Sequence, residues 1–387
     1  MLYFVDQILN LPNLTVGNCY FEPGKIILEL ESVDGRADCK QCGRTSEYIN
    51  QTRKVTVRDL SILGNQVFLV FDRHQFYCEN CNTYFVEKLS FIDFNRHMTE
   101  RYKNFIFEKV KVSTITQVAK EEGLKYDQVK GVFEEQFNKI PILANPKRIC
   151  IDEFSHRKGR GKFATVICDV DNGILIEVID SHKQQEIIEA LKQWSLERRE
   201  AVVEVSVDMW GGFTKVIQEI FPNARIVYDR FHIMKILNEE LNKIRGKYKN
   251  ELSKLNIKNI KYLLMKNGED LTENERKLLE AILKCSSRLK NAYLLKEELR
   301  QIFETHQTPE EAKKQIEAWL VKASKFYTGF IDTVKNHIDG ICNYFYNRLT
   351  SGVMEGINNK IKLIKRQAYG FTNFDHLRIR LLAGFAP

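Results

Sequence analysis

The order of hydrophobic and polar residues changes along the chain, from strand-like alternation at the start to helical periodicity further on. Residues 13–32 alternate on both sides of Glu22-Pro23-Gly24-Lys25, a sequence typical of a turn. Segments 55–57 and 67–76 are further predicted strands, with a second turn signal between them. Residues 1–90 are therefore predicted to form a small β-rich domain.

Helical periodicity replaces this alternation over residues 99–139, and a short linker bounded by Pro141 and Pro146 follows. We interpret residues 91–140 as a second, helical domain. After the linker the strand-like segments are 149–154, 163–169, 175–180, 202–207 and 225–228, and the helix-like segments are 184–195 and 212–220.

Three consecutive strands followed by alternating helices and strands predict a mixed sheet with helices on its faces. This order matches the ribonuclease-H-like fold. Residues 235–345, approximately, are almost wholly helical and are predicted to be an insertion before a last helix that begins near Gly352. The expected fold class is a multidomain α/β protein whose ribonuclease-H-like domain spans residues 147–387.

Composition does not change the predicted fold class, but it indicates where in the cell the protein is expected. The 387 residues are 43% hydrophobic and 28% charged, and no stretch approaches the roughly 20 apolar residues that a membrane helix needs. The first residues lack a basic region and include Asp6, so they match a signal peptide poorly. We expect a cytoplasmic protein with no membrane partner. The net charge of +8 is a mild preference for polyanions.

Four of the nine cysteines form two pairs, Cys39 with Cys42 and Cys78 with Cys81, and predicted strands separate the pairs. Each C-x-x-C pair can present two thiolates to one tetrahedral zinc ion. Chance cysteines or redox pairs are the alternatives. Four thiolates leave no open position for chemistry, so we predict one structural Zn²⁺ that stabilises a domain too small to hold itself together by burial.

The segment 114–133 has the spacing of a helix-turn-helix, with Ala119 where two helices approach closely and Gly123 in the turn. Its predicted shared core is Val118, Leu124, Val129 and Val132. The second helix would present four residues to a DNA groove: Lys125, Tyr126, Gln128 and Lys130. A plain helical hairpin is the alternative, and the near balance of charges in this segment does not decide between them.

Three of the predicted apolar strands end with an acid, at Asp152, Asp208 and Asp229, and His232 lies three residues after the last. Acids at strand ends converge at one edge of a sheet, where active sites form. Clustered carboxylates repel one another and therefore favour hard cations such as Mg²⁺ or Mn²⁺. Two such ions can assist phosphodiester cleavage. Any one of these acids could instead be a helix N-cap, and that alternative is strongest for Asp229.

The last helix supplies a further carboxylate. Glu355, Asn359, Lys362 and Arg366 share one face at helical spacing, while apolar residues occupy another. Glu355 could bind metal there, and Lys362 and Arg366 could bind DNA phosphate. Taken alone, a solvated amphipathic helix with a chance acid explains this pattern as well.

These features together resemble the zinc-ribbon insertion-sequence transposases of the ISL-three group. The matching pieces, in order, are the cysteine pairs and then IDEFSHRKGRGKFATVICD, VSVDMWGGF, FPNARIVYDRFHIMK and MEGINNKIKLIKRQAYGF. The resemblance implies a DDE transposase with Asp152, Asp208 and Glu355 as the catalytic triad and two divalent metal ions. Asp229 and His232 are possible accessory residues, ranked below Asp208 because the second acid of this fold follows the strand after the first helix.

The resemblance also implies the substrates and partners. We expect the protein to bind the terminal inverted repeats of a prokaryotic mobile element, to cut and join DNA strands there, and to engage target DNA. A homodimer or higher oligomer is expected in the DNA complex, which would lie on the nucleoid. Two other functions stay open: a DNA-binding regulator derived from a transposase, and a structure-specific nuclease that cuts without joining.

Overall fold

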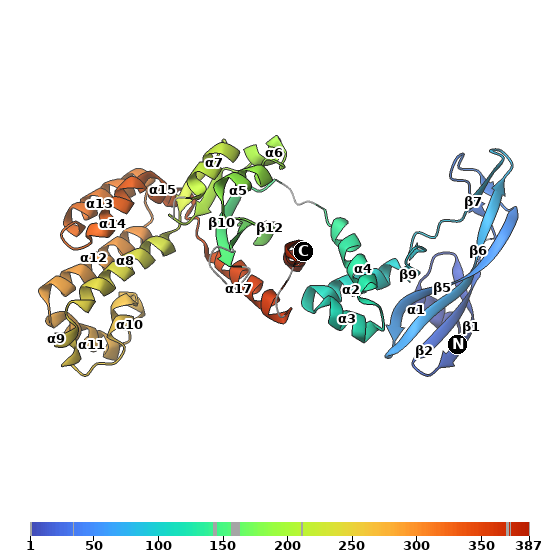
Figure 1. Ribbon diagram of the computed structural model, residues 1–387, viewed down its shortest axis with the longest axis horizontal. Coiled ribbons are helices and arrows are strands. Elements are labelled where there is room, and N and C mark those ends of the chain that lie inside the picture. Colours follow the sequence, from blue (N-terminus) through green and yellow to red (C-terminus); the bar gives the residue numbers. More distant parts are fainter. Residues whose placement is uncertain are drawn as a thin grey trace. The chain divides into compact units, whose positions relative to one another are not determined.

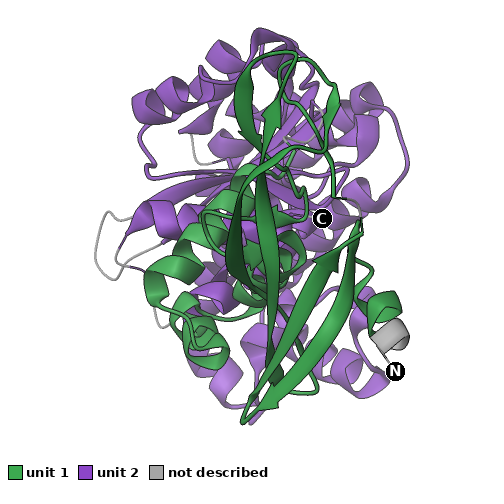
Figure 2. Ribbon diagram, turned by 90° about the vertical axis from the view of Figure 1, so that its right-hand side faces the viewer, with its two compact units in different colours: residues 1–141, 367–369 green, residues 142–366, 370–387 purple. Residues whose placement is uncertain are grey.

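The computed structural model describes residues 2–33, 35–141, 145–155, 163–209, 212–368, 371 and 373–386. The chain divides into two compact units, Met1–Pro141 with Gln367–Tyr369, and Ile142–Arg366 with Gly370–Pro387 (Figures 1 and 2). None of the described helices is long and apolar enough to cross a membrane.

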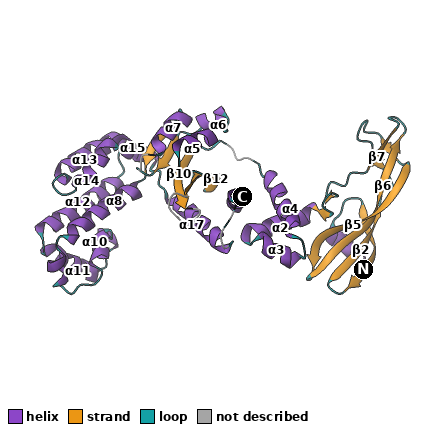
Figure 3. Ribbon diagram, in the orientation of Figure 1, coloured by secondary structure: helices purple, strands orange, loops and turns teal. Residues whose placement is uncertain are grey.

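The described part of the first unit contains a seven-stranded sheet of order β1-β2-β6-β5-β9-β8, with β7 paired to β6 (Figure 3). Its strands are β1 (Leu14–Glu22), β2 (Lys25–Ser32), β5 (Ile49–Ile62), β6 (Asn65–Cys78), β7 (Thr83–Val86), β8 (Ile92–Asp93) and β9 (Met98–Thr99). Helix α1 (Leu2–Leu9) precedes the sheet, and β3 (Ala37–Asp38) pairs with β4 (Thr45–Ser46).

Two tight turns organise this sheet. Gly24 and Gly64 have φ of 76° and 81°, a left-handed conformation that glycine adopts without steric cost, and they connect β1 to β2 and β5 to β6. The core beneath is apolar, and Val57, Val67 and Leu69 are fully buried. The predicted strand at 55–57 was too short, because polar, exposed residues on both faces hide the start of β5 from a periodicity argument.

Three helices complete the first unit: α2 (Glu100–Val112), α3 (Ile115–Glu122) and α4 (Tyr126–Asn138). Thr99 and Thr114 cap the first two by accepting backbone N–H groups, as Ser and Thr commonly do at helix starts. Gly123 ends α3 with a φ of 66°, as the sequence predicted. The residues that share the core between these helices are Val118, Ala119, Val129 and Val132, with Leu124 half-buried.

The second unit is organised around a five-stranded sheet of order β12-β11-β10-β13-β14. The strands are β10 (Arg148–Ser155), β11 (Phe163–Asp169), β12 (Ile174–Ile179), β13 (Glu204–Val207) and β14 (Arg225–Tyr228). β10, β11 and β12 are antiparallel, whereas β10, β13 and β14 are parallel. The predicted mixed sheet of a ribonuclease-H-like fold is thereby confirmed.

Helices cover both faces of this sheet (Figure 1). Successive residues of β10 point to opposite faces: Ile149 and Ile151 join a core with α5 (Gln184–Leu191) and α7 (Phe213–Ile220), while Cys150 joins a core with α17 (Gly352–Gln367) and α18 (Phe374–Phe385). The predicted helix at 184–195 ends earlier, and a separate α6 (Leu196–Glu200) begins at the Ser195 cap.

The predicted helical insertion lies between β14 and α17, and its apolar core is continuous with one face of the sheet. Its elements are α8 (Arg230–Gly246), α9 (Lys249–Ser253), α10 (Ile260–Met265), the 3₁₀ turn η1 (Gly268–Asp270), α11 (Glu273–Lys284), α12 (Ser287–Glu304), α13 (Pro309–Ala323), α14 (Thr328–Asn336), α15 (Ile338–Cys342) and α16 (Tyr344–Asn347).

Candidate active site and metal centres

The three predicted acids stand side by side on neighbouring strands of the second sheet. Asp208 and Asp229 directly follow β13 and β14, as predicted, but Asp152 lies within β10, whose pairing with β11 continues to Ser155. Parallel pairing places Cys150 beside Ser206 and Val207 beside Tyr228, so the acids that follow these residues come from neighbouring strands. They line one cavity of about 190 Å³ together with residues of α8 and α17. The candidate site residues that this cavity brings together are Asp152, Asp208, Asp229, His232, Glu355 and Lys362.

Asp152 is held by two hydrogen bonds. The backbone N–H of Glu153 donates to Oδ1 at 2.8 Å, and the amide of Asn358 on α17 donates to Oδ2 at 2.7 Å. Burial raises the pKa of Asp152 above its ordinary value, and these hydrogen bonds oppose the rise only in part. The charge of Asp208 adds to the increase. A site that gathers carboxylates in this way favours a bound cation.

Asp208 and Asp229 occupy different environments. The Asp208 side chain is 38% exposed, while Asp229 is buried at the start of α8. Asp229 accepts hydrogen bonds from the backbone N–H of Phe231 at 3.2 Å and from the hydroxyl of Ser351 at 2.5 Å. It therefore caps α8, which was the alternative reading of its sequence position. His232 Nδ1 lies 3.7 Å from a carboxylate oxygen of each acid.

Glu355 reaches the cavity from the first turn of α17. Met354, Ile357, Ile361 and Ile364 of this helix pack on the sheet. Because side chains three or four residues apart share a helix face, this packing leaves Glu355, Asn358 and Lys362 beside the cavity. Arg366 lies further along α17 and does not line the cavity.

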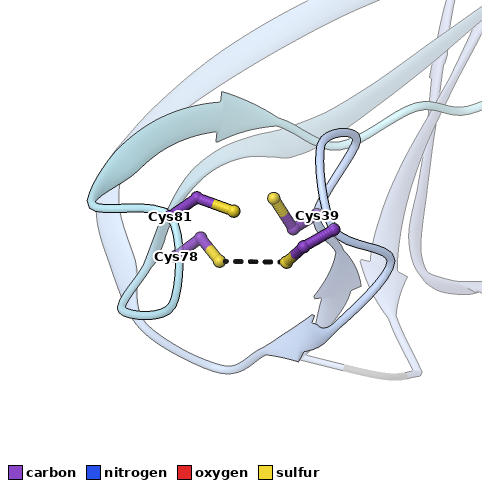
Figure 4. A group of neighbouring side chains, drawn as sticks. Cys39, Cys78 and Cys81 are labelled. Carbon is purple, nitrogen blue, oxygen red and sulfur yellow. Dashed lines mark hydrogen bonds between the residues drawn. The ribbon is translucent and has the colours of Figure 1, made fainter.

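The four paired cysteines form a compact cluster in the first unit, with all four sulfurs within 4.8 Å of one another. In Figure 4 the thiols of Cys39, Cys78 and Cys81 converge, and the dashed line marks the contact of 3.7 Å between Cys42 Sγ and Cys78 Sγ. A tetrahedral zinc with Zn–S bonds of about 2.3 Å separates its sulfurs by about 3.8 Å. The cluster fits a structural zinc ion.

The thiols of this cluster interact electrostatically. A hydrogen bond from the backbone of Arg44, assisted by the neighbouring thiols, lowers the pKa of Cys42 to about 6. Its hydrogen bond with Cys42 raises the pKa of Cys81 to about 12. Metal coordination binds cysteines as thiolates, and a bound cation would offset their charge.

The predicted DNA-reading residues lie at the start of α4. Lys125, Tyr126 and Gln128 are exposed, and Lys130 is half-buried with Nζ 3.7 Å from a carboxylate oxygen of Glu134. Gln128 also accepts the backbone N–H of Lys125 at 2.9 Å, so part of its role is to cap the helix. Lys125 and Tyr126 are the least constrained of the four.

Comparison with known proteins identifies the family. Residues 149–381 match the family model DDE_Tnp_ISL3, described as transposase, and residues 36–81 match the zinc-finger of transposase IS204/IS1001/IS1096/IS1165. The chain belongs to the ISL3 transposase family. Its resemblance to this family, inferred from the motifs, is confirmed.

Two curated relatives carry the same kind of name. This transposase is 27% identical over 366 residues to the transposase for insertion sequence element IS1001 of Bordetella parapertussis. The aligned region covers 90% of this chain and 88% of the relative. It is also 28% identical over 292 residues to the transposase for IS1557 of Mycobacterium tuberculosis. That aligned region covers 67% of this chain and 65% of the relative. The similarity to the first relative spans both units.

The carboxylates of the transposase cavity differ from the cysteine cluster in spacing. Within the described ranges, two groups bring three or more ligand atoms within 4.8 Å: the cysteines, and Asp93 with Glu100 and Glu135. The second group surrounds the ammonium of Lys103 and is an ion-pair cluster. The cavity acids stand further apart than either group. Their hard oxygen donors suit divalent cations that keep positions free for substrate.

Two residues of the site, Asn358 and Ser351, were not predicted from the sequence. Asn358 holds Asp152, and Ser351 holds Asp229. Asn358 was recoverable, because it lies three residues after Glu355 and therefore on the same helix face. Ser351 precedes α17, and its contact with Asp229 joins positions 122 residues apart, so no local pattern indicates it.

Proposed function

We propose that this transposase binds the terminal inverted repeats of its insertion sequence and uses Asp152, Asp208 and Glu355 for metal-dependent strand cleavage and strand transfer. The observation that supports this most is the shared cavity, where two acids from adjacent parallel strands meet a glutamate from α17. This is an arrangement of hard ligands around an open space, as phosphoryl transfer requires.

The three carboxylates would hold two divalent ions, Mg²⁺ or Mn²⁺. Such ions lower the pKa of an attacking water or 3′ hydroxyl and offset negative charge on the leaving oxygen. In cleavage, water attacks the phosphorus, the P–O3′ bond breaks, and the strand end keeps a 3′ hydroxyl. In joining, that hydroxyl attacks a target phosphodiester and displaces its 3′ oxygen. Both steps need placement and charge neutralisation and no protein nucleophile.

The remaining residues of the cavity position these groups. Asn358 fixes one oxygen of Asp152. Asp229 and His232 act as accessory residues: the buried Asp229 anchors the start of α8, and His232 lies between Asp229 and Asp208. Lys362 would contact a DNA phosphate beside the acids, and Arg366 would extend that contact along α17.

DNA recognition is assigned to the first unit. Lys125, Tyr126, Gln128 and Lys130 of α4 would enter a groove of the terminal repeat, with the lysines bound to phosphates. Because the two ends of an element must be cut and joined together, we propose a homodimer or larger assembly on the nucleoid, in the cytoplasm of its host.

The decisive experiment mixes the purified chain with Mg²⁺ or Mn²⁺, DNA that carries an element end, and target DNA, and maps the cuts and the joints. Cuts at the element boundary and new joints in the target support the proposal. Cutting without joining and without preference for element ends indicates a nuclease. End binding without any cutting in either metal indicates a regulator.

A further inference from the structure

A second cavity, of about 720 Å³, lies in the same unit beside the candidate active site. Its walls come from α8, α10, α12 and the start of α17 (Figure 1). Asp229, Phe231, Ser351 and Glu355 line both cavities and so form their shared wall. The volume lies within the range of about 300–1,000 Å³ typical of small-molecule sites.

Phe231 is an exposed aromatic residue in the middle of this shared wall. The residue is 60% exposed. The residues next to it on the side of the active site, Asp229 and His232, are charged or polar, so Phe231 is the apolar group at this place. Its backbone N–H donates to Asp229 at 3.2 Å, which fixes its place in the first turn of α8. Its ring contacts the edge of His232, with centroids 5.7 Å apart. Most of the ring surface is free to contact a ligand.

The second cavity also offers groups that suit a nucleotide. Lys235 and Lys261 are exposed and form no ion pair within the described part of the chain. The arginines of this wall already form ion pairs. A guanidinium nitrogen of Arg230 lies 2.9 Å from a carboxylate oxygen of Glu304, and one of Arg300 lies 3.1 Å from a carboxylate oxygen of Glu297. The amide oxygen of Asn238 is buried without a hydrogen-bond partner among the described residues.

We infer that the second cavity receives one unstacked nucleotide of the DNA strand next to the scissile phosphate, with its base stacked on Phe231. Lys235 and Lys261 would bind the flanking phosphates, and the amide of Asn238 would hydrogen-bond the base edge. The inference rests on the proposed cleavage at the neighbouring acids. Enzymes that reach into a duplex extrude a nucleotide in this way, and an aromatic face accepts any base.

The test measures cleavage of end DNA by wild-type protein, Phe231→Ala and Phe231→Trp. We expect Phe231→Ala to cut matched duplex ends about ten-fold or more slowly, the scale of one lost base–aromatic stack, and Phe231→Trp to retain activity. Tyr262→Ala is the matched control, because Tyr262 is 57% exposed in the same unit and lines neither cavity. Its rate should equal that of the wild-type protein.

The substrate then separates stacking from a structural role. A mismatch beside the cut lowers the cost of unstacking, so it should restore most of the rate of Phe231→Ala, while a mismatch about one helical turn away should not. Unchanged cleavage by Phe231→Ala, or equal effects of the two mismatches, would overturn the inference and leave the proposed function intact. If wild-type protein fails to cut either substrate, the proposed function itself is wrong.

A spectroscopic readout needs no cleavage. Asp152→Asn protein is bound to end DNA that carries 2-aminopurine beside the cut, whose fluorescence rises when the base leaves the duplex stack. We expect a rise on binding, and a smaller rise with Asp152→Asn combined with Phe231→Ala. Fluorescence that stays at the level of free duplex would contradict the inference.

Discussion

The cysteine cluster and the carboxylate cavity both offer ligands that suit metal ions, yet they are built in opposite ways. The four sulfurs lie within 4.8 Å of one another, close enough to share one ion. The acids Asp152, Asp208 and Glu355 line a cavity of about 190 Å³, which leaves open space between their side chains. A structural zinc needs every position filled by protein, whereas phosphoryl transfer needs positions left for water and DNA.

The two sites also differ in how the protein tolerates their charge. In the cysteine cluster, neighbouring groups lower the pKa of Cys42 to about 6 and raise the pKa of Cys81 to about 12. In the cavity, a hydrogen bond from Asn358 holds the Asp152 carboxylate. Burial disfavours its ionised form and raises its pKa. We therefore expect the first site to need metal for its folding and the second to need metal for its activity.

The largest expected effect comes from the cavity. Asp152→Asn, Asp208→Asn or Glu355→Gln should each lower cleavage and joining by about 1,000-fold or more, the scale at which lost charge stabilisation affects phosphoryl transfer. End binding in a gel-shift assay should stay unchanged, because the proposed DNA-reading helix is in the other unit. If all three variants still cut and join DNA, the proposed mechanism is wrong.

Asp229→Asn tests the ranking of the acids. Since Asp229 is buried and caps α8, its substitution should lower activity partly and lower the melting temperature as well. The opposite pattern, with full activity in Asp208→Asn and none in Asp229→Asn, would make Asp229 the second catalytic acid.

Removal of the cysteine ligands should act on folding. Wild-type protein should contain one zinc per chain by elemental analysis, and the double variant Cys39→Ser with Cys78→Ser should contain none. Its residues 36–81 should become sensitive to protease, because zinc binding stabilises such modules by several kcal/mol or more. Cys285→Ser, a half-buried cysteine of the helical insertion, is the matched control and should keep its zinc. Equal zinc in both variants would contradict the assignment.

The contrast between the sites explains what the sequence could predict. The cysteine cluster is readable because each half is local: Cys39 and Cys42 share one turn, where Gly43 has a φ of 73°. The acids Asp152, Asp208 and Asp229 were found because each follows a run of apolar strand residues and parallel strands bring such positions to one edge. Asp229 is buried and Asp208 is 38% exposed, a difference that strand patterns do not encode.

Other features depend on tertiary structure alone. The contact of Asn358 with Asp152 joins positions 206 residues apart, and that of Ser351 with Asp229 crosses the whole helical insertion. The start of β5 was missed because its polar residues are held by pairing with β6 and not by a buried face. Periodicity reports burial, so it detects elements with an apolar face and misses contacts made at their ends.

A smaller effect is expected at α4, which tests whether DNA recognition is separate from the cavity. Lys125→Ala should weaken binding of end DNA and lower the slope of log affinity against log salt by about 1, as for one lost phosphate contact. Lys130→Ala should change both less, because Lys130 is half-buried near Glu134. Lys277→Ala, a surface lysine of the helical insertion, is the control. Equal affinity for end DNA and random DNA would contradict recognition by α4.

The smallest expected effect is on the stability of the metal-free cavity. Burial raises the pKa of Asp152 in the folded state, so the folded protein binds that proton more tightly than the unfolded chain. Ionised Asp152 therefore destabilises the fold above its folded pKa, and this cost disappears as the pH falls toward the unfolded value of about 3.9. Asp152→Asn removes the cost. The Asn358 oxygen has no hydrogen-bond partner among the described residues, and it can accept from the new amide if Asn358 turns over.

In metal-free buffer at neutral pH, Asp152→Asn should consequently melt about 2–4 °C higher than wild type, which corresponds to about 1 kcal/mol for a unit of this size. The difference should shrink as the pH approaches 4. Added Mg²⁺ should raise the melting temperature of wild type but have less effect on the variant, because the variant has lost a ligand. A variant that melts lower than wild type at every pH would show that Asp152 is held by contacts stronger than its burial cost. The cavity would then be preformed without metal, and its contrast with the cysteine cluster would be one of spacing alone.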